Sequence, residues 1–165
     1  MSYPIEFVRK LNFPEIPESV LPDMAKWDDF DYINQKNLDS DKSPHTVVTD
    51  DENEKMNEWC QKNICDSLYY LYRIAINGHE MHKDCGYNEG KKISLTARLY
   101  YPIVTGGDSV KTCFWANDKK TLLKEYVLQP KTWYLLAGST YHSVPNIPPG
   151  NYRLAVTAQV LHELF

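Results

Sequence analysis

Residues 68–78 read LYYLYRIAING, an aromatic and β-branched run that ends in a turn dipeptide. β-branched and aromatic residues favour strands, and Asn-Gly is a strong turn signal. The stretch therefore predicts a strand over residues 68–76 that stops at Asn77-Gly78. It also marks a change of pattern, because the residues before it are less regular and those after it form short strand-like runs.

Short apolar and β-branched runs continue from this strand to near the end of the chain. Segments with turn chemistry separate them, among them Gly106-Gly107-Asp108 and Pro148-Pro149-Gly150. Many short strands at this spacing are typical of a β-sandwich or jelly roll. The runs cover residues 93–103, 110–115, 125–128, 132–136, 141–144 and 152–161.

The part before residue 68 is predicted to be a wrapping segment followed by one helix. Residues 1–50 show no sustained period, so they predict loop with one or two short helical pieces. Thr49 or Asp50 can cap a helix whose first turn is acidic, and apolar residues then recur at helical spacing. We therefore expect a helix over about residues 50–66.

Composition excludes some classes of protein. The 165-residue chain has 18 Lys and Arg against 22 Asp and Glu, with no basic run, so nucleic acid is an unlikely primary partner. No stretch is long and apolar enough for a membrane span, and residues 1–10 lack the apolar stretch of a signal peptide. We expect a soluble cytoplasmic protein with reduced cysteines, since its four cysteines form no CxxC pair.

Residues 78–86, GHEMHKDCG, concentrate two histidines, two acids and a cysteine in a chain with only five histidines. On a strand, residues i and i+2 point the same way, so His82 and Asp84 would present an imidazole and a carboxylate together. His142, a polar residue in a strand-like run, is a candidate third ligand. Two histidines and one carboxylate form the facial triad of Fe(II) oxygenases, whereas zinc usually takes four ligands.

Arg153 is a charged residue in an apolar run, residues 152–156, that follows the turn at residues 148–150. An arginine is rarely buried without a partner, and a guanidinium can bind a carboxylate through two hydrogen bonds. Arg153 is therefore a candidate for binding an anionic cosubstrate.

The order His82-x-Asp84, His142, Arg153 resembles the signature of the iron- and 2-oxoglutarate-dependent oxygenases, most nearly the prolyl 4-hydroxylase-like branch. The resemblance covers about residues 68–160. Residues 93–101 look like the strand that gives a tyrosine to the far carboxylate of the cosubstrate. Residues 106–108 are similar to the family's Gly-Gly-acid turn, and residues 128–137 to the strand pair before the distal histidine. The implied fold is mainly β, a double-stranded β-helix (cupin-type jelly roll) with an N-terminal helical segment.

The resemblance implies one dioxygenase domain over residues 1–165, with residues 1–67 as N-terminal wrap and helix and 68–162 as jelly-roll core. It implies Fe(II) held by His82, Asp84 and His142, with Arg153 and Tyr101 binding 2-oxoglutarate. No catalytic residue beyond the metal centre is expected, and ascorbate is a further candidate cofactor.

The implied reaction is hydroxylation of an amino-acid side chain, with succinate and CO2 as co-products. The substrate would be a peptide, a protein or a free amino acid, and peptidyl proline is the leading candidate. Because Asp84 is present, no ligand position is vacant for halide, which favours hydroxylation over halogenation.

The sequence departs from the family in two places. The turn before the first ligand is reduced to Asn77-Gly78, and Ala155 stands where many relatives have a serine. These departures leave open which hydroxyl assists cosubstrate binding. Alignment favours Tyr101, and Tyr100 and Tyr72 remain alternatives.

Two other readings of the chain stay open. A cupin-like binding protein would keep the barrel and bind a metal or small ligand without turnover. A zinc-stabilised module would instead use a second set of ligands, namely His79, His82 and Cys85 with Cys60 and Cys65.

Overall fold

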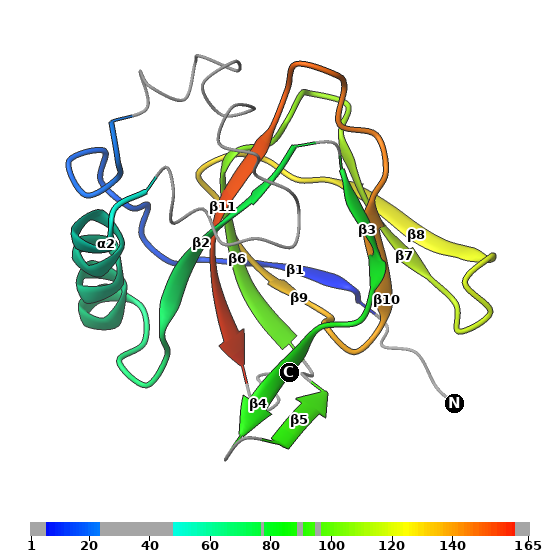
Figure 1. The fold of residues 1–165 in the computed structure, drawn as a ribbon, viewed down its shortest axis with the longest axis horizontal. Helices are drawn as coiled ribbons and strands as arrows, with labels where there is room; N and C mark the ends of the chain where they lie inside the picture. The colour runs from blue at the N-terminus through cyan, green and yellow to red at the C-terminus, as the bar shows by residue number, and fades with distance from the viewer. Residues whose placement is uncertain (1–5, 24–47, 77, 89–90, 95–96, 161–165) are drawn as a thin grey trace.

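The computed structural model describes residues 6–23, 48–76, 78–88, 91–94 and 97–160 (Figure 1). These residues are mainly β, with one α-helix among them. The elements in chain order are β1 (Val8–Leu11), α2 (Asp50–Asn63), β2 (Tyr70–Ala75), β3 (His79–His82), β4 (Cys85–Asn88), β5 (Lys91–Ser94), β6 (Ala97–Val104), β7 (Lys111–Trp115), β8 (Leu122–Val127), β9 (Trp133–Leu136), β10 (Tyr141–Val144) and β11 (Arg153–Val160).

Two antiparallel sheets make up the barrel (Figure 1). One has the strand order β1-β9-β6-β11-β2 and the other the order β3-β10-β7-β8, while β4 and β5 form a separate two-stranded ribbon. From β2 onward the chain crosses repeatedly between the two sheets, with β7 and β8 as a hairpin in the four-stranded one. This winding is that of a double-stranded β-helix, so the predicted jelly roll is confirmed.

Helix α2 begins where the sequence predicts. Thr49 is its N-cap, and a capping box joins the Thr49 and Glu52 side chains to each other's backbone N–H groups. Three acidic residues in the first turn favour the positive end of the helix dipole. The helix ends at Asn63 with Ile64 as C-cap, slightly earlier than the predicted residue 66.

Helix α2 packs beside β2, an edge strand of the five-stranded sheet (Figure 1). It also closes the free edge of β2. The Tyr70 N–H donates to Oδ1 of Asn57 at 2.9 Å, and the Tyr72 N–H donates to Oδ1 of Asn53 at 3.4 Å. Side chains thus satisfy backbone groups that an edge strand would otherwise expose.

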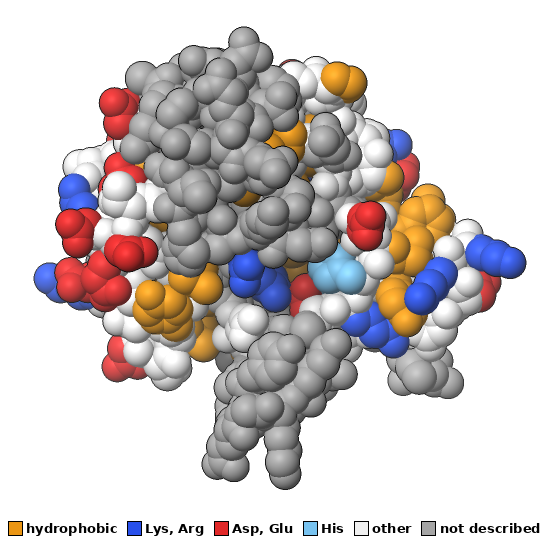
Figure 2. Space-filling model, viewed as in Figure 1, with side chains coloured by type: hydrophobic (Ala, Val, Ile, Leu, Met, Phe, Trp, Pro, Cys, Tyr) orange, Lys and Arg blue, Asp and Glu red, His pale blue; other side chains and the backbone are white. Residues whose placement is uncertain are grey.

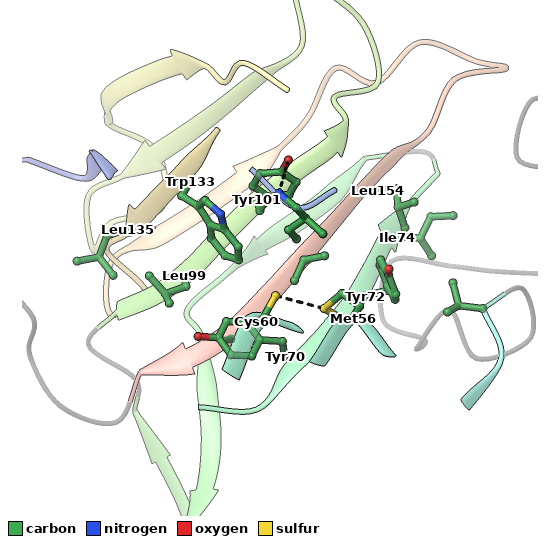
Figure 3. Packing of buried hydrophobic residues seen from close by; sticks show 14 of the residues in the cluster. Met56, Cys60, Tyr70, Tyr72, Ile74, Leu99, Tyr101, Trp133, Leu135 and Leu154 are labelled. Atoms are coloured by element: carbon green, nitrogen blue, oxygen red, sulfur yellow. Dashed lines mark hydrogen bonds between the residues drawn. The ribbon is translucent and has the colours of Figure 1, made fainter. Parts of the chain in front are cut away.

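Side chains alternate across the five-stranded sheet. On one face, residues such as Tyr72, Tyr101 and Leu154 pack with Met56 and Cys60 of α2 in the main core (Figure 3). Residues of opposite parity on the same strands face the four-stranded sheet and line the cavity described below. The main core therefore lies outside the barrel, and the barrel interior stays partly polar.

The N-terminal prediction was wrong for residues 8–11. They form strand β1, which pairs with β9 from Val8 opposite Leu136 to Leu11 opposite Trp133. An edge strand is stabilised by a partner more than a hundred residues away, which local periodicity cannot reveal. Most of the remaining wrap, residues 24–47, lies outside the described residues.

The predicted single run over residues 93–103 contains the end of β5 and most of β6. The other predicted strands match β2 and β7 to β11 with shifts of a few residues at their ends. No helix in the described part of the chain is long and apolar enough to cross a membrane.

Candidate metal centre

Strand pairing brings three potential metal ligands together. His82 is the last residue of β3, and His142, on β10, lies directly opposite it in the antiparallel pair. Asp84 follows His82 by two residues. One ligand atom from each of the three residues lies within 4.8 Å of the other two, an arrangement that could hold a metal ion.

Backbone carbonyls fix the orientation of both imidazoles. Nδ1 of His82 lies 2.7 Å from the Glu80 carbonyl oxygen, and Nδ1 of His142 lies 2.8 Å from that of Thr140. A carbonyl can only accept, so Nδ1 carries a hydrogen in each ring, and Nε2 is the nitrogen that would bind a metal after losing any proton it shares with Asp84. Both Nε2 atoms lie 3.3 Å from Oδ1 of Asp84.

The two oxygens of Asp84 have different partners. Oδ1 faces the histidines, while Oδ2 accepts a hydrogen bond from Nε of Arg98 at 3.0 Å. With Oδ2 held in this way, Oδ1 is the oxygen presented to a metal. Arg98 comes from β6 in the opposite sheet, so this ion pair also links the two sheets.

Burial and hydrogen bonding compete at these groups. Burial alone would raise the pKa of Asp84, but hydrogen bonds from His142 and His82 and the charge of Arg98 outweigh it and hold the pKa well below its usual range. Burial tends to lower the pKa of His82, yet its hydrogen bonds to Asp84 and to the Glu80 carbonyl raise it overall. The carboxylate is thus ionised and ready to bind a cation.

The three residues open onto a cavity of about 300 Å³ between the two sheets. Figure 2 shows basic, acidic and histidine side chains side by side near the middle of the face it presents. The described residues that line the cavity are Arg73, Ile74, Ala75, His82, Lys83, Asp84, Arg98, Tyr100, Thr112, Leu136, His142, Val144, Arg153, Thr157 and Gln159.

Arg153, the first residue of β11, lies in this cavity and is only 3% exposed. Its Nε donates to the Thr105 carbonyl at 2.9 Å and its Nη1 to Oγ1 of Thr112 at 2.8 Å. Its Nη2 is buried without a hydrogen-bond partner among the described residues. A buried guanidinium nitrogen without a partner is costly, and an anion in the cavity would supply the missing acceptor.

Tyr101 lies on the other face of β6, away from the cavity. Its ring packs 4.9 Å from that of Trp133, and its hydroxyl accepts the Ile16 N–H at 3.2 Å (Figure 3). Tyr100, the preceding residue of the same strand, lines the cavity instead. Tyr72 also belongs to the main core. Of the three candidate tyrosines, Tyr100 is therefore the one that lines the cavity.

Sequence reasoning missed two arginines that line the cavity, Arg73 on β2 and Arg98 on β6. Each is a charged residue in a run that is otherwise mostly apolar or small, which is the same signal that identified Arg153. Applied to every strand, that criterion would have found both.

The alternative zinc ligands are not brought together in the part of the chain whose side chains the structure describes. Cys60 lies in the main core with its Sγ 3.7 Å from Sδ of Met56, and burial raises its pKa to about 12. Cys65 contacts Ser67. The side chains of His79 and Cys85 lie outside the described set, within which His82, Asp84 and His142 are the one group of this kind.

No family model and no curated protein matches the chain. Among solved structures, it is similar to a Pseudomonas putida prolyl-4-hydroxylase, with a TM-score of 0.42 and 12% identity over 98% of this chain and 90% of that one. It is also similar to the viral collagen prolyl hydroxylase of Paramecium Bursaria Chlorella virus-1, in complex with 2-oxoglutarate, with a TM-score of 0.44 and 10% identity over 94% of this chain and 95% of that one.

A third similar structure is CytC3 with Fe(II) and alpha-ketoglutarate, with a TM-score of 0.43 and 12% identity over 90% of this chain and 78% of that one. All three likenesses are distant in both sequence and structure. What this chain does must therefore be inferred from its own site, a buried carboxylate between two oriented imidazoles in a jelly-roll cavity.

Proposed function

We propose that the protein is an Fe(II)- and 2-oxoglutarate-dependent dioxygenase in which His82, Asp84 and His142 hold the metal. The donor set supports this proposal, because two neutral imidazoles and one carboxylate suit Fe(II) and leave coordination positions open for substrate chemistry. Their orientation by the Glu80 and Thr140 carbonyls supports it further, as metal-binding histidines commonly have such partners.

The observation that carries the proposal is the unpartnered buried Nη2 of Arg153 in the same cavity as the triad. A dicarboxylate can bind a metal at one end and accept hydrogen bonds from a guanidinium at the other. We assign the far carboxylate of 2-oxoglutarate to Arg153, which Thr105 and Thr112 hold in place. Tyr100 takes the role that alignment gave to Tyr101.

With Fe(II) and 2-oxoglutarate bound, the centre would supply oxygen-activating chemistry that converts 2-oxoglutarate to succinate and CO2 and adds one oxygen atom to the substrate. The chain's own residues position and shield these groups. Arg98 holds Oδ2 of Asp84, and the apolar side chains of Leu136 and Val144 limit water in the cavity. Because Asp84 fills a ligand position, the proposed outcome is hydroxylation, not halogenation.

The proposed substrate is an amino-acid side chain, either free or in a peptide. Peptidyl proline is the candidate suggested by the sequence resemblance. Ascorbate is a candidate for keeping the metal reduced, and no residue of the cavity is assigned to it.

The test is succinate formation by purified protein supplied with Fe(II), oxygen and 2-oxoglutarate. Free amino acids and proline-containing peptides are added separately, and mass spectrometry measures the gain of one oxygen atom. Succinate should require Fe(II) and should disappear in His142→Ala. Absence of succinate with every substrate, from protein that binds Fe(II), would favour a non-catalytic cupin-like binding protein.

A further inference from the structure

Among the described residues that line the cavity, positive charges outnumber negative ones. Of these described lining residues, four are basic, namely Arg73, Lys83, Arg98 and Arg153, and Asp84 is the one acid. A bound divalent metal would increase this excess. Anionic ligands are needed to balance such a site.

Three of the four basic groups already have an interaction partner or a proposed ligand. Arg98 donates to Asp84, and Arg153 belongs to the proposed cosubstrate site. The Lys83 ammonium lies 4.6 Å from the centre of the Tyr141 ring, where a cation–π contact stabilises it. Arg73 remains.

Among the described residues, none forms a close ion pair with Arg73. Its Nε is buried and has no hydrogen-bond partner among the described residues. Burial lowers the pKa of Arg73, and the like charge of Arg98 lowers it further, while Asp84 raises it. The guanidinium is thus partly desolvated near a second cation, a costly arrangement that a bound anion would relieve.

The position of Arg73 separates it from the cosubstrate site. Arg73 pairs with Ala155 of β11, whereas Arg153 pairs with Ala75 of β2. The two arginines are therefore offset by two residues along neighbouring strands, roughly 7 Å at the rise of a β-strand. Both arginines line the same cavity. Anions bound at Arg153 and at Arg73 would therefore occupy different parts of the cavity.

On the basis of the proposed dioxygenase function, we propose that Arg73 binds a carboxylate of the prime substrate. A planar guanidinium matches a carboxylate through paired hydrogen bonds, and the free Nε supplies one of them. The substrate is then either a free amino acid, bound by its α-carboxylate, or an Asp or Glu side chain within a peptide. An uncharged residue inside a peptide, such as an internal proline, lacks this group.

The test measures binding, so it does not require turnover. Zn(II) replaces Fe(II), and the melting temperature of the 165-residue protein is recorded with 2-oxoglutarate and with each probe, both separately and together. The probes are the common L-amino acids and their N-acetyl amides, which lack the α-carboxylate. Capped Asp and Glu keep a side-chain carboxylate, so the two sets distinguish the two sources.

Arg73→Met removes the guanidinium, Arg73→Lys keeps the charge without Nε, and Arg9→Met makes the same change at an exposed arginine on β1. We expect a carboxylate probe to stabilise wild type and Arg9→Met. Arg73→Met should bind it at least about 30-fold more weakly, the equivalent of about 2 kcal/mol, and Arg73→Lys should bind it with intermediate affinity. The increase in melting temperature caused by 2-oxoglutarate should be the same in all variants.

Three results would overturn the assignment: equal probe affinity in wild type, Arg73→Met and Arg73→Lys; capped uncharged amino acids binding as well as free ones; or no stabilisation by any carboxylate probe. Failure of the proposed function has a different signature. In that case 2-oxoglutarate itself gives no shift in the Zn(II) protein, whatever the probes do.

Discussion

At the scale of single residues, Asp84 connects the site to the fold. Its two oxygens join histidines from one sheet to an arginine from the other, and its side chain is almost completely buried. A buried carboxylate of this kind remains ionised because its partners outweigh the cost of desolvation. The same contacts determine how strongly protons compete with a metal for Asp84 and the two histidines.

Metal affinity should fall as the pH decreases below neutral. The pKa of His82 is raised, so its ring keeps a proton at a higher pH than the ordinary histidine value of about 6.5. A metal must displace that proton, and affinity should therefore decrease by up to about tenfold per pH unit once His82 is protonated. Asp84 contributes nothing in this range because its pKa is low. Zn(II) titration at several pH values checks this, and a constant affinity between about pH 6 and 8 would contradict it.

Arg153→Ala should weaken 2-oxoglutarate binding while leaving the metal site intact. Truncating one partner of a buried charged pair costs about 2–5 kcal/mol, or about 30-fold to several thousand-fold in affinity. Isothermal titration of the Zn(II) protein with 2-oxoglutarate measures the change. Arg153→Lys tests whether charge alone suffices, and Arg9→Ala is the exposed control. Equal affinities in wild type and Arg153→Ala would exclude the assigned role.

At the scale of elements, helix α2 and strand β11 both hold β2 in position. It pairs with β11 on one side, and asparagines of the helix satisfy N–H groups on the other. The strand carries Arg73, so the helix indirectly positions a residue of the cavity. The polar contacts between helix and strand should therefore contribute measurably to stability.

Asn57→Ala should destabilise the fold by about 1–3 kcal/mol. The substitution leaves the buried Tyr70 N–H without its acceptor, and Asn57 is only 2% exposed. Urea unfolding measures the change in free energy. Asn57→Asp keeps an acceptor oxygen and should cost less, while Asn63→Ala, at an exposed site on the same helix, is the control. An Asn57→Ala variant as stable as wild type would show that the contact is dispensable.

At the scale of the whole molecule, the triad lies where the two sheets are tied together. His82 and His142 belong to the four-stranded sheet, and Asp84 is held by Arg98 of the five-stranded sheet. A metal at this point would bind only the folded barrel, because the unfolded chain does not bring the ligands together.

Metal should therefore stabilise the protein as a whole. At a free metal concentration of about 100 times Kd, the gain is about 2.7 kcal/mol, which corresponds to about 5–11 °C in Tm for a chain of this size. Differential scanning fluorimetry with Zn(II) or Mn(II), then with excess EDTA, measures it. His142→Ala should lose the response. The same Tm with metal and with chelator in wild type would contradict the metal centre.

The sequence by itself determined the strand-rich pattern, the start of α2 and the candidate triad. Each depends on local chemistry: strand propensity between turns, an N-cap followed by an acidic first turn, and the i, i+2 spacing of His82 and Asp84. His142 comes close to that pair because of the jelly-roll winding. The family resemblance implied this winding, and in the structure β10 pairs with β3 so that His142 lies opposite His82.

Only the tertiary structure decided which face of each strand points into the cavity. Side chains alternate along a strand, so Tyr100 and Tyr101 must lie on opposite faces of the sheet. The sequence does not say which of them faces the cavity, because both faces of the five-stranded sheet are covered. The same decision places Arg73 beside Arg98 and Arg153. The pairing of β1 with β9 was equally hidden, since its stabilising partner is distant in the chain. Local sequence specifies periodicity, whereas packing between distant segments specifies the side that becomes the site.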